Sequence, residues 1–177
     1  MSRLKRSFFK KNTLTVARNL LGCVLCRKIG NTVFRGIIVE TEAYTQDEPS
    51  CHAFKGLTPR CEVMFREGGH LYVYFTYGMH HCMNVVTEKE GRGCAVLIRA
   101  LEPLGFEGTN GPARLCKALN ITKELNGIDL TSEDSPVWIE RGKKPAEIVE
   151  TTRIGIKLAA DYPWRFYIKD NAWVSRK

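Results

Sequence analysis

Acidic and phenolic side chains alternate at the end of an apolar run in the first quarter of the chain, where residues 37–44 read IIVETEAY. Glu40, Glu42 and Tyr44 are spaced by two, so on a strand they share one face. Carboxylates at the solvated end of a sheet commonly pair with Lys or Arg. A carboxylate in a partly desolvated cleft can instead act as a general base. This stretch alone leaves both interpretations open.

A second group of candidate residues is aromatic. Tyr72, Tyr74 and Tyr77 crowd around a turn at residues 77–79. Tyrosine is favoured in strands and packs across them, but large flat side chains at a turn also suit stacking on nucleobases or wedging between them. The preceding polar loop carries basic side chains that include His52, Lys55, Arg60 and Arg66. These side chains can contact phosphates, and a solvated face explains them nearly as well.

Two polar residues interrupt runs that otherwise resemble strands. Asn84 and Arg99 each need partners if they are buried. Either they satisfy backbone groups and acids of the sheet, or they belong to a site. In a site, Asn84 would select which base edge fits, and Arg99 would fix a water, a phosphate or the catalytic carboxylate.

Metal ligation is the less favoured interpretation of the cysteines and histidines. The seven cysteines are odd in number and lie mostly in apolar segments, as expected for reduced thiols inside a cell. The pair Cys23 and Cys26 has no second pair at metal-binding spacing. His80 and His81 are adjacent, so on a strand they point to opposite faces. We therefore expect no metal site.

Length and charge limit the class of protein. A chain of 177 residues, 44% hydrophobic and 26% charged, fits one folded domain that needs no disulfide or metal for stability. The net charge is +8, and residues 1–11 contribute five Lys or Arg without an acid. This excess favours a polyanionic partner such as nucleic acid, although a flexible, solvated tail also explains the basic start. No apolar run approaches the roughly 20 residues that span a bilayer, so we expect an intracellular protein that makes no use of a membrane.

The elements that must position these residues follow from periodicity and turn signals. Strands follow strands, and helices occur at the front and in the second half, which is typical of an α+β fold with a mainly antiparallel sheet. We predict one domain with a curved sheet flanked by helices and a protruding hairpin. The predicted strands are 23–29, 33–44, 71–77, 82–87, 94–101, 137–140 and 165–168, and the predicted helices lie within 12–22 and 111–119. Residues 45–70 form a long polar loop, and such loops are usually functional or poorly ordered.

The ordered set of motifs resembles the alkyladenine (3-methyladenine) DNA glycosylase family. The motifs are ARNLLG (17–22), IVETEAY (38–44), YVYFTYGM (72–79), CMN (82–84), VLIRALEP (96–103), GPARLCKAL (111–119) and RFYI (165–168). They are collinear and cover nearly the whole chain beyond residues 1–11. The resemblance assigns residues 12–177 to the glycosylase domain and leaves 1–11 as a basic, flexible tail.

This resemblance implies an enzyme that flips alkylated or deaminated purines out of duplex DNA and hydrolyses the N-glycosidic bond, leaving an abasic site. It implies a cofactor-free monomer whose partner is damaged double-stranded DNA, located in the nucleus if the source is eukaryotic. By the same match, Glu42 activates the attacking water, and Arg99 helps to hold that water and the neighbouring phosphate. The base pocket would consist of Tyr44, His52, Tyr74, Asn84 and Leu97. Tyr77 and Met79 would intercalate, and Arg60 and Arg114 would contact phosphates.

Two other interpretations compete with this one. A nucleic-acid-binding module without catalysis would use the same basic surface and tyrosines but would not need Glu42. A metal-dependent hydrolase would use Glu40, Glu42, His80 and His81, against which the strand geometry already counts.

Overall fold

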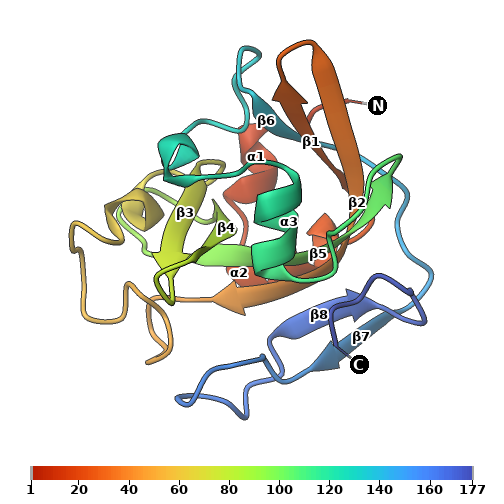
Figure 1. The fold of residues 1–177 in the computed structure, drawn as a ribbon. Helices are drawn as coiled ribbons and strands as arrows, with labels where there is room; N and C mark the ends of the chain where they lie inside the picture. Colours follow the sequence, from red (N-terminus) through yellow and green to blue (C-terminus); the bar gives the residue numbers. More distant parts are fainter. Residues whose placement is uncertain (1, 177) are drawn as a thin grey trace.

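The computed structural model describes residues 2–176 and has an α+β architecture, as predicted (Figure 1). The helices are α1 (Arg6–Phe9), α2 (Thr13–Leu20) and α3 (Pro112–Ala118), with short 3-10 turns η1 (Glu62–Phe65) and η2 (Lys123–Leu125). The strands are β1 (Val24–Ile29), β2 (Thr32–Tyr44), β3 (Leu71–Thr76), β4 (His80–Val86), β5 (Ala95–Leu104), β6 (Val137–Glu140), β7 (Ile148–Thr151) and β8 (Arg165–Ile168).

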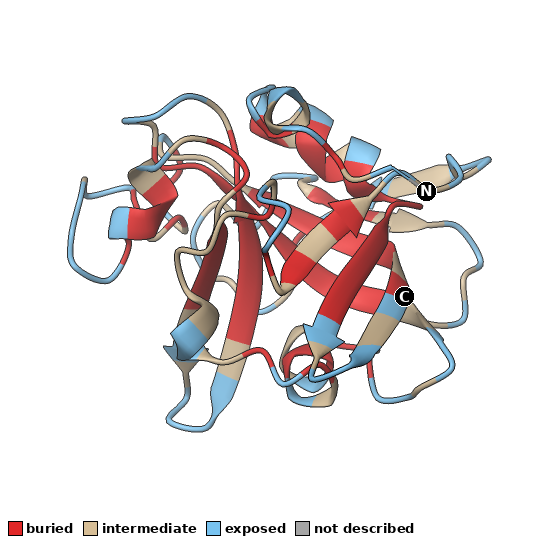
Figure 2. Cartoon of the chain, turned by 90° about the horizontal axis from the view of Figure 1, so that it is seen from above, coloured by how far each residue is buried: buried red, intermediate tan, exposed pale blue. Residues whose placement is uncertain are grey.

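The strands form one curled antiparallel sheet. Its main order is β3-β4-β5-β2-β1-β6, and β8 joins β2 to β7 at the side (Figure 1). Figure 2 shows that the middle of the sheet is buried, whereas the exposed residues lie mainly in loops and at strand ends. Helix α2 packs on β2, and α3 packs on β4 and β5. The apolar core therefore lies between the sheet and these two helices, around residues such as Leu20, Leu25, Ile98, Leu115 and Phe166.

Local signals explain where these helices begin. The side chain of Asn12 accepts hydrogen bonds from the backbone N–H groups of Leu14 and Thr15, which caps α2. Helix α3 begins with Pro112, whose missing N–H would be unpaired at that position anyway. Both helices lie within the ranges that the sequence predicted, 12–22 and 111–119.

Strand β2 positions the acidic motif. One edge of its last part pairs with β5 and the other with β8, so the motif lies inside the sheet. The register with β5 shifts between Ile38 and Thr41, which marks a β-bulge. A bulge bends the strand and re-aims its side chains. Residues 38–43 are all buried, so both faces of this segment are covered.

Strands β3 and β4 form the predicted protruding hairpin, with Thr76 and His80 as the last residue pair. At its tip Tyr77 has a φ of 51° and Gly78 a φ of 66°, the left-handed backbone that tight turns use. The tip exposes 84% of Tyr77 and 69% of Met79. Two large apolar side chains therefore face solvent at the tip of the hairpin.

The first residues differ from the flexible tail that the sequence predicted. Leu4 and Phe9 are buried, and the Leu4 N–H donates to the carbonyl of Ile139. Arg6 pairs with Asp129, and the Lys10 Nζ lies 2.7 Å from a Glu67 oxygen. Two of the basic side chains in residues 2–11, Arg6 and Lys10, thus find acidic partners far along the chain, which composition cannot show. The structure joins this segment to the domain; residue 1 lies outside the described residues.

None of the helices within residues 2–176 has both the length and the apolar character needed to span a bilayer.

Candidate active site

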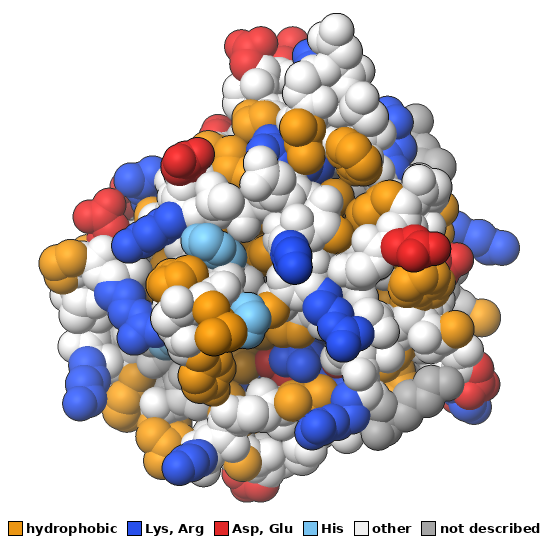
Figure 3. Space-filling view, viewed as in Figure 1, with side chains coloured by type: hydrophobic (Ala, Val, Ile, Leu, Met, Phe, Trp, Pro, Cys, Tyr) orange, Lys and Arg blue, Asp and Glu red, His pale blue; other side chains and the backbone are white. Residues whose placement is uncertain are grey.

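A cavity of about 320 Å³ opens beside the end of β2 and contains the predicted site. All seven residues predicted for catalysis or for the base pocket line it: Glu42, Tyr44, His52, Tyr74, Asn84, Leu97 and Arg99. They come from β2, β3, β4, β5 and the loop after β2, so the curled sheet brings together residues that are far apart in sequence. Figure 3 shows Lys and Arg side chains, with apolar ones between them, spread over the face that carries the hairpin and α3.

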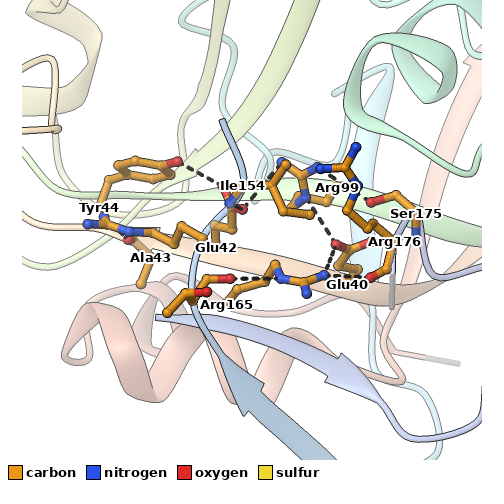
Figure 4. A network of polar contacts seen from close by, with 11 residues as sticks. Glu40, Glu42, Ala43, Tyr44, Arg99, Ile154, Arg165, Ser175 and Arg176 are labelled. Carbon is orange, nitrogen blue, oxygen red and sulfur yellow. Dashed lines mark hydrogen bonds and ion pairs between the residues drawn. The ribbon is translucent and has the colours of Figure 1, made fainter. Parts of the chain in front are cut away.

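The carboxylate of Glu42 has donors on both oxygens (Figure 4). The Tyr44 hydroxyl donates to Oε2 at 2.7 Å, and the Ile154 backbone N–H donates to Oε1 at 2.8 Å. The Arg99 Nη1 lies 3.3 Å from Oε1. Burial, and then the charge of Glu42, raise the pKa of Tyr44 well above its usual value, so its hydroxyl stays protonated and remains a donor. These contacts fix the orientation of Glu42 against the cavity.

Arg99 lies between two carboxylates. Its Nε donates to Glu40 Oε1 at 3.0 Å, while Nη1 faces Glu42. Burial opposes the charge of this guanidinium, but the carboxylates of Glu42 and Glu40 outweigh burial, and its pKa lies above the usual value. Arg99 therefore remains cationic on the cavity wall.

His52 and Tyr74 form an aromatic wall. Their ring centroids are 4.6 Å apart at an interplanar angle of 76°. The Nδ1 of His52 lies 2.9 Å from the hydroxyl of Tyr72, a residue that sequence analysis noticed in the hairpin but did not place in the pocket. Burial, helped by the nearby charge of Arg60, lowers the pKa of His52 to about 4. The imidazole is therefore neutral at physiological pH, and the wall carries no positive charge of its own.

Asn84 and Leu97 face each other across β4 and β5, where they are register partners. The side-chain nitrogen of Asn84 donates to the carbonyl of Tyr72 at 3.1 Å, so the amide is held in one orientation. Leu97 is 4% exposed and supplies an apolar surface to the cavity.

The remaining predicted residues lie at or beyond the mouth of the cavity. Arg60 and Tyr77 line it and are exposed. Met79 and Arg114 are exposed but do not line it. Arg114 lies on α3, two residues after the lining residue Pro112, and its Nη1 donates to Asn110 at 3.0 Å.

Comparison with known proteins identifies the family of this chain. The model of the methylpurine-DNA glycosylase family matches residues 7–172. The chain is 50% identical to a protein of Carboxydothermus hydrogenoformans, with 98% of this chain and 99% of the relative covered. It is 45% identical to a protein of Methanoculleus marisnigri (98% and 99% covered) and 44% identical to one of Francisella tularensis (97% of each). The names of these relatives assign them provisionally to the 3-methyladenine DNA glycosylases.

The chain belongs to the methylpurine-DNA glycosylase family. It is therefore a DNA glycosylase of DNA repair, an enzyme that hydrolyses N-glycosyl bonds, as the sequence resemblance implied. The family match begins at residue 7, inside the segment that sequence analysis had separated from the domain.

The structure adds residues to the glycosylase site that sequence analysis did not assign. The loop between β7 and β8 supplies Ile154, Gly155 and Ile156 to the cavity wall. Before them, Arg153 is buried, pairs with Glu48 at 2.7 Å and stacks on the ring of Tyr44 at 4.7 Å. No local sequence pattern predicts these contacts, because the partners of this loop are more than a hundred residues away in the chain. A buried arginine is recognisable only once the fold surrounds it.

The cysteines of the glycosylase are free and buried. Burial raises the pKa of the Cys26 and Cys51 thiols to about 12 each, so these two are protonated and unreactive near neutral pH. Across residues 2–176, no three His, Cys, Asp or Glu side chains gather in a way that could hold a metal ion.

Proposed function

We propose that this glycosylase excises alkylated and deaminated purines of the 3-methyladenine, hypoxanthine and ethenoadenine type from duplex DNA, using a water activated by Glu42. The observation that carries the proposal is the position of Glu42. Its carboxylate is fixed by donors on both oxygens and lines a cavity with aromatic walls.

The cavity suits a single extruded nucleobase. Its volume of about 320 Å³ lies at the lower end of the roughly 300–1,000 Å³ typical of small-molecule pockets. Flipping a nucleotide into it costs a few kcal/mol, and less for a damaged, weakly paired base. Tyr77, largely exposed at the hairpin tip beside the cavity mouth, can fill the space that the nucleotide leaves, with Met79 next to it.

The walls favour damaged purines. Tyr44, Tyr74 and a neutral His52 offer electron-rich rings to a cationic, alkylated base. Asn84, held by the Tyr72 carbonyl, would crowd the exocyclic amine of a normal guanine, and Leu97 would support the base from below. Arg60 at the mouth and Arg114 on α3 are exposed and would contact phosphates.

The chemistry needs one carboxylate. Glu42 accepts a proton as the water oxygen attacks C1′, and the C1′–N bond breaks with its electron pair passing to the departing base. Oxocarbenium character develops on the sugar, and a nearby carboxylate stabilises it. Arg99 and the Ile154 N–H keep Glu42 oriented in this step. A cationic base leaves readily, whereas a neutral base such as hypoxanthine needs a proton donor or hydrogen bonds.

The decisive experiment compares the wild type with Glu42→Gln on duplexes that each carry one lesion, scoring abasic sites by alkaline cleavage under single-turnover conditions. Loss of a general base lowers the rate by about 10²–10⁴-fold, so we expect Glu42→Gln to lose excision and keep lesion binding. Glu147→Gln, which removes an exposed carboxylate paired with Lys169, is the matched control. Excision by Glu42→Gln at the wild-type rate would contradict the proposal. Tighter binding by this variant, with no excision by either protein, would favour a binding module.

We also keep as predictions that the enzyme acts as a monomer and inside the cell. Size-exclusion chromatography with light scattering tests the first, because a dimer would have twice the 20.1 kDa mass of the chain.

A further inference from the structure

A second carboxylate lies behind Glu42 and is not part of the cavity wall. Glu40 is fully buried and does not line the cavity. It nevertheless accepts three hydrogen bonds: from Arg99 Nε at 3.0 Å, from Arg165 Nη1 at 2.9 Å and from the Ser175 backbone N–H at 2.7 Å (Figure 4). Because Glu40 does not line the cavity, it cannot contact DNA there directly, whereas Glu42 does line it.

Glu40, Glu42, Arg99 and Arg165 form a charge-balanced cluster that we call the buried quartet. Two carboxylates oppose two guanidiniums, and Arg99 bridges the carboxylates. Arg165 contacts Glu40, and its further hydrogen bonds go to the backbone carbonyls of Thr152 and Arg176. Buried charges are tolerated when they are paired and hydrogen-bonded, so removing one member leaves an excess charge beside Glu42.

We infer that Glu40 is a positioning residue for the hydrolysis reaction, acting on Glu42 through Arg99. This inference rests on the proposed role of Glu42 as the base. By holding Nε of Arg99, Glu40 directs only one nitrogen of the guanidinium, Nη1, toward Glu42. By balancing the charge of Arg165, it prevents two cations from facing a single carboxylate.

Loss of Glu40 has a defined physical consequence. The guanidinium of Arg99, released from one carboxylate, would turn toward the other and form a two-pronged pair with it. Such a pair occupies lone pairs that Glu42 needs to accept a proton from water. The excess positive charge also favours the ionised form of Glu42, which makes it a weaker base.

The groups that face Glu42 must be considered together for any statement about pH. They are Arg99 on β5, Tyr44 on β2, Tyr74 on β3, Cys82 on β4 and Arg165, the register partner of Glu42 on β8, with Arg153 stacked behind Tyr44. The cations in this set are the three arginines, of which Arg165 is paired with Glu40 and Arg153 with Glu48. The charge balance around Glu42 is therefore set mainly by Arg99 and by what neutralises it.

The test is the pH dependence of single-turnover excision in three variants. Glu40→Gln removes a negative charge. We therefore expect the acid limb of its pH–rate profile, the part where excision slows as pH falls, to move to lower pH by about half a unit or more. We expect its maximal rate to fall by about ten- to a hundredfold, because small displacements of a catalytic group have effects of this size. Arg165→Gln removes a positive charge and should move the acid limb to higher pH. The double variant restores the balance and should return the limb toward the wild-type position.

Shifts of the acid limb in opposite directions in Glu40→Gln and Arg165→Gln are the result that a purely structural role would not give. Val39→Ala serves as the control, because it creates a cavity in the same strand without changing charge. It should lower stability and leave the limb in place. The inference would be overturned if the acid limbs of both Glu40→Gln and Arg165→Gln stay at the wild-type pH. It would also be overturned if both limbs shift equally in the same direction. If Glu40→Gln does not fold, Arg165→Gln and the double variant still decide the matter.

The two proposals fail differently. Excision by Glu42→Gln would refute the role of Glu42 and, with it, the role of Glu40. An inactive Glu42→Gln together with a wild-type pH profile for Glu40→Gln would refute the positioning role alone.

Discussion

Replacing Arg153 by methionine should cause one of the largest losses of stability available in this glycosylase. The guanidinium is buried, and it donates to Glu48 at 2.7 and 3.2 Å and to the carbonyls of Ala43 and Ala159 at 2.9 and 3.1 Å. Without it, Glu48 is left buried with donors from Ser50 only. Removing one partner of a buried ion pair typically lowers the free energy of unfolding by about 3–5 kcal/mol.

A second ion pair in the protein provides the matched control. Lys169 Nζ lies 2.8 Å from Glu147 Oε1, nearly the distance in the Arg153 pair, but both side chains are exposed. Exposed pairs are screened by solvent and contribute little, so Lys169→Met should hardly change stability. The comparison holds distance nearly constant and changes burial, which is the variable that decides the magnitude.

Urea denaturation at neutral pH, followed by circular dichroism, measures both variants. In the double variant Arg153→Met with Glu48→Gln, no unpaired charge remains. Its loss should therefore be smaller than the sum of the two single losses by about 1 kcal/mol or more. A loss below about 1 kcal/mol for Arg153→Met, or additivity within about 0.5 kcal/mol, would refute the reasoning. Arg153→Met should also slow excision, because Arg153 supports Tyr44 and the loop that holds Glu42.

Two further predictions concern the hairpin and the aromatic wall. Tyr77→Ala should leave stability within about 0.5 kcal/mol, because the side chain is exposed, but should slow excision from duplex DNA more than from single strands; equal slowing on both substrates would argue against a wedge. The lowered pKa of His52, about 4, means that the unfolded chain binds a proton below about pH 6.5 and the folded chain does not. Stability should therefore fall as pH drops from about 6.5 toward 4. Denaturation curves measured at several pH values should show a weaker fall in His52→Gln. An unchanged dependence of stability on pH in this variant would mean that a group other than His52 causes the fall.

The parts of the fold that the sequence predicted are those with local signals. Alternation and turn residues located the strand at residues 33–44, observed as Thr32–Tyr44, and the hairpin, to within a few residues. Two helices were located within residues 12–22 and 111–119, the second from Pro112 near its start, but the Asn12 cap of the first was not predicted. Strand β7 was missed, since Ile148–Thr151 is short and partly exposed and lacks a clear alternation. The burial of Leu4 and Phe9 was missed because the basic composition around them dominated the interpretation.

For the site, the motif match gathered residues that the structure then placed around one cavity. It could not gather those whose role depends on partners distant in sequence. Glu40 was noticed beside Glu42 but received no role of its own, because its three donors come from β5, β8 and the end of the described chain. Arg165 appeared only as part of a strand for the same reason. Charge pairing between remote segments leaves no spacing signal in a single sequence.

The bulge in β2 connects the sequence motif to the chemistry. On a regular strand, Glu40 and Glu42 would lie on one face about 7 Å apart along the strand axis. The register shifts on both sides of Glu40, so the strand bends where its two acids lie, and a single guanidinium from β5 contacts both. Glu42 then lines the cavity, while Glu40 stays behind it among arginines. The spacing of two residues is thus compatible with two different roles, because the bulge gives the carboxylates different surroundings.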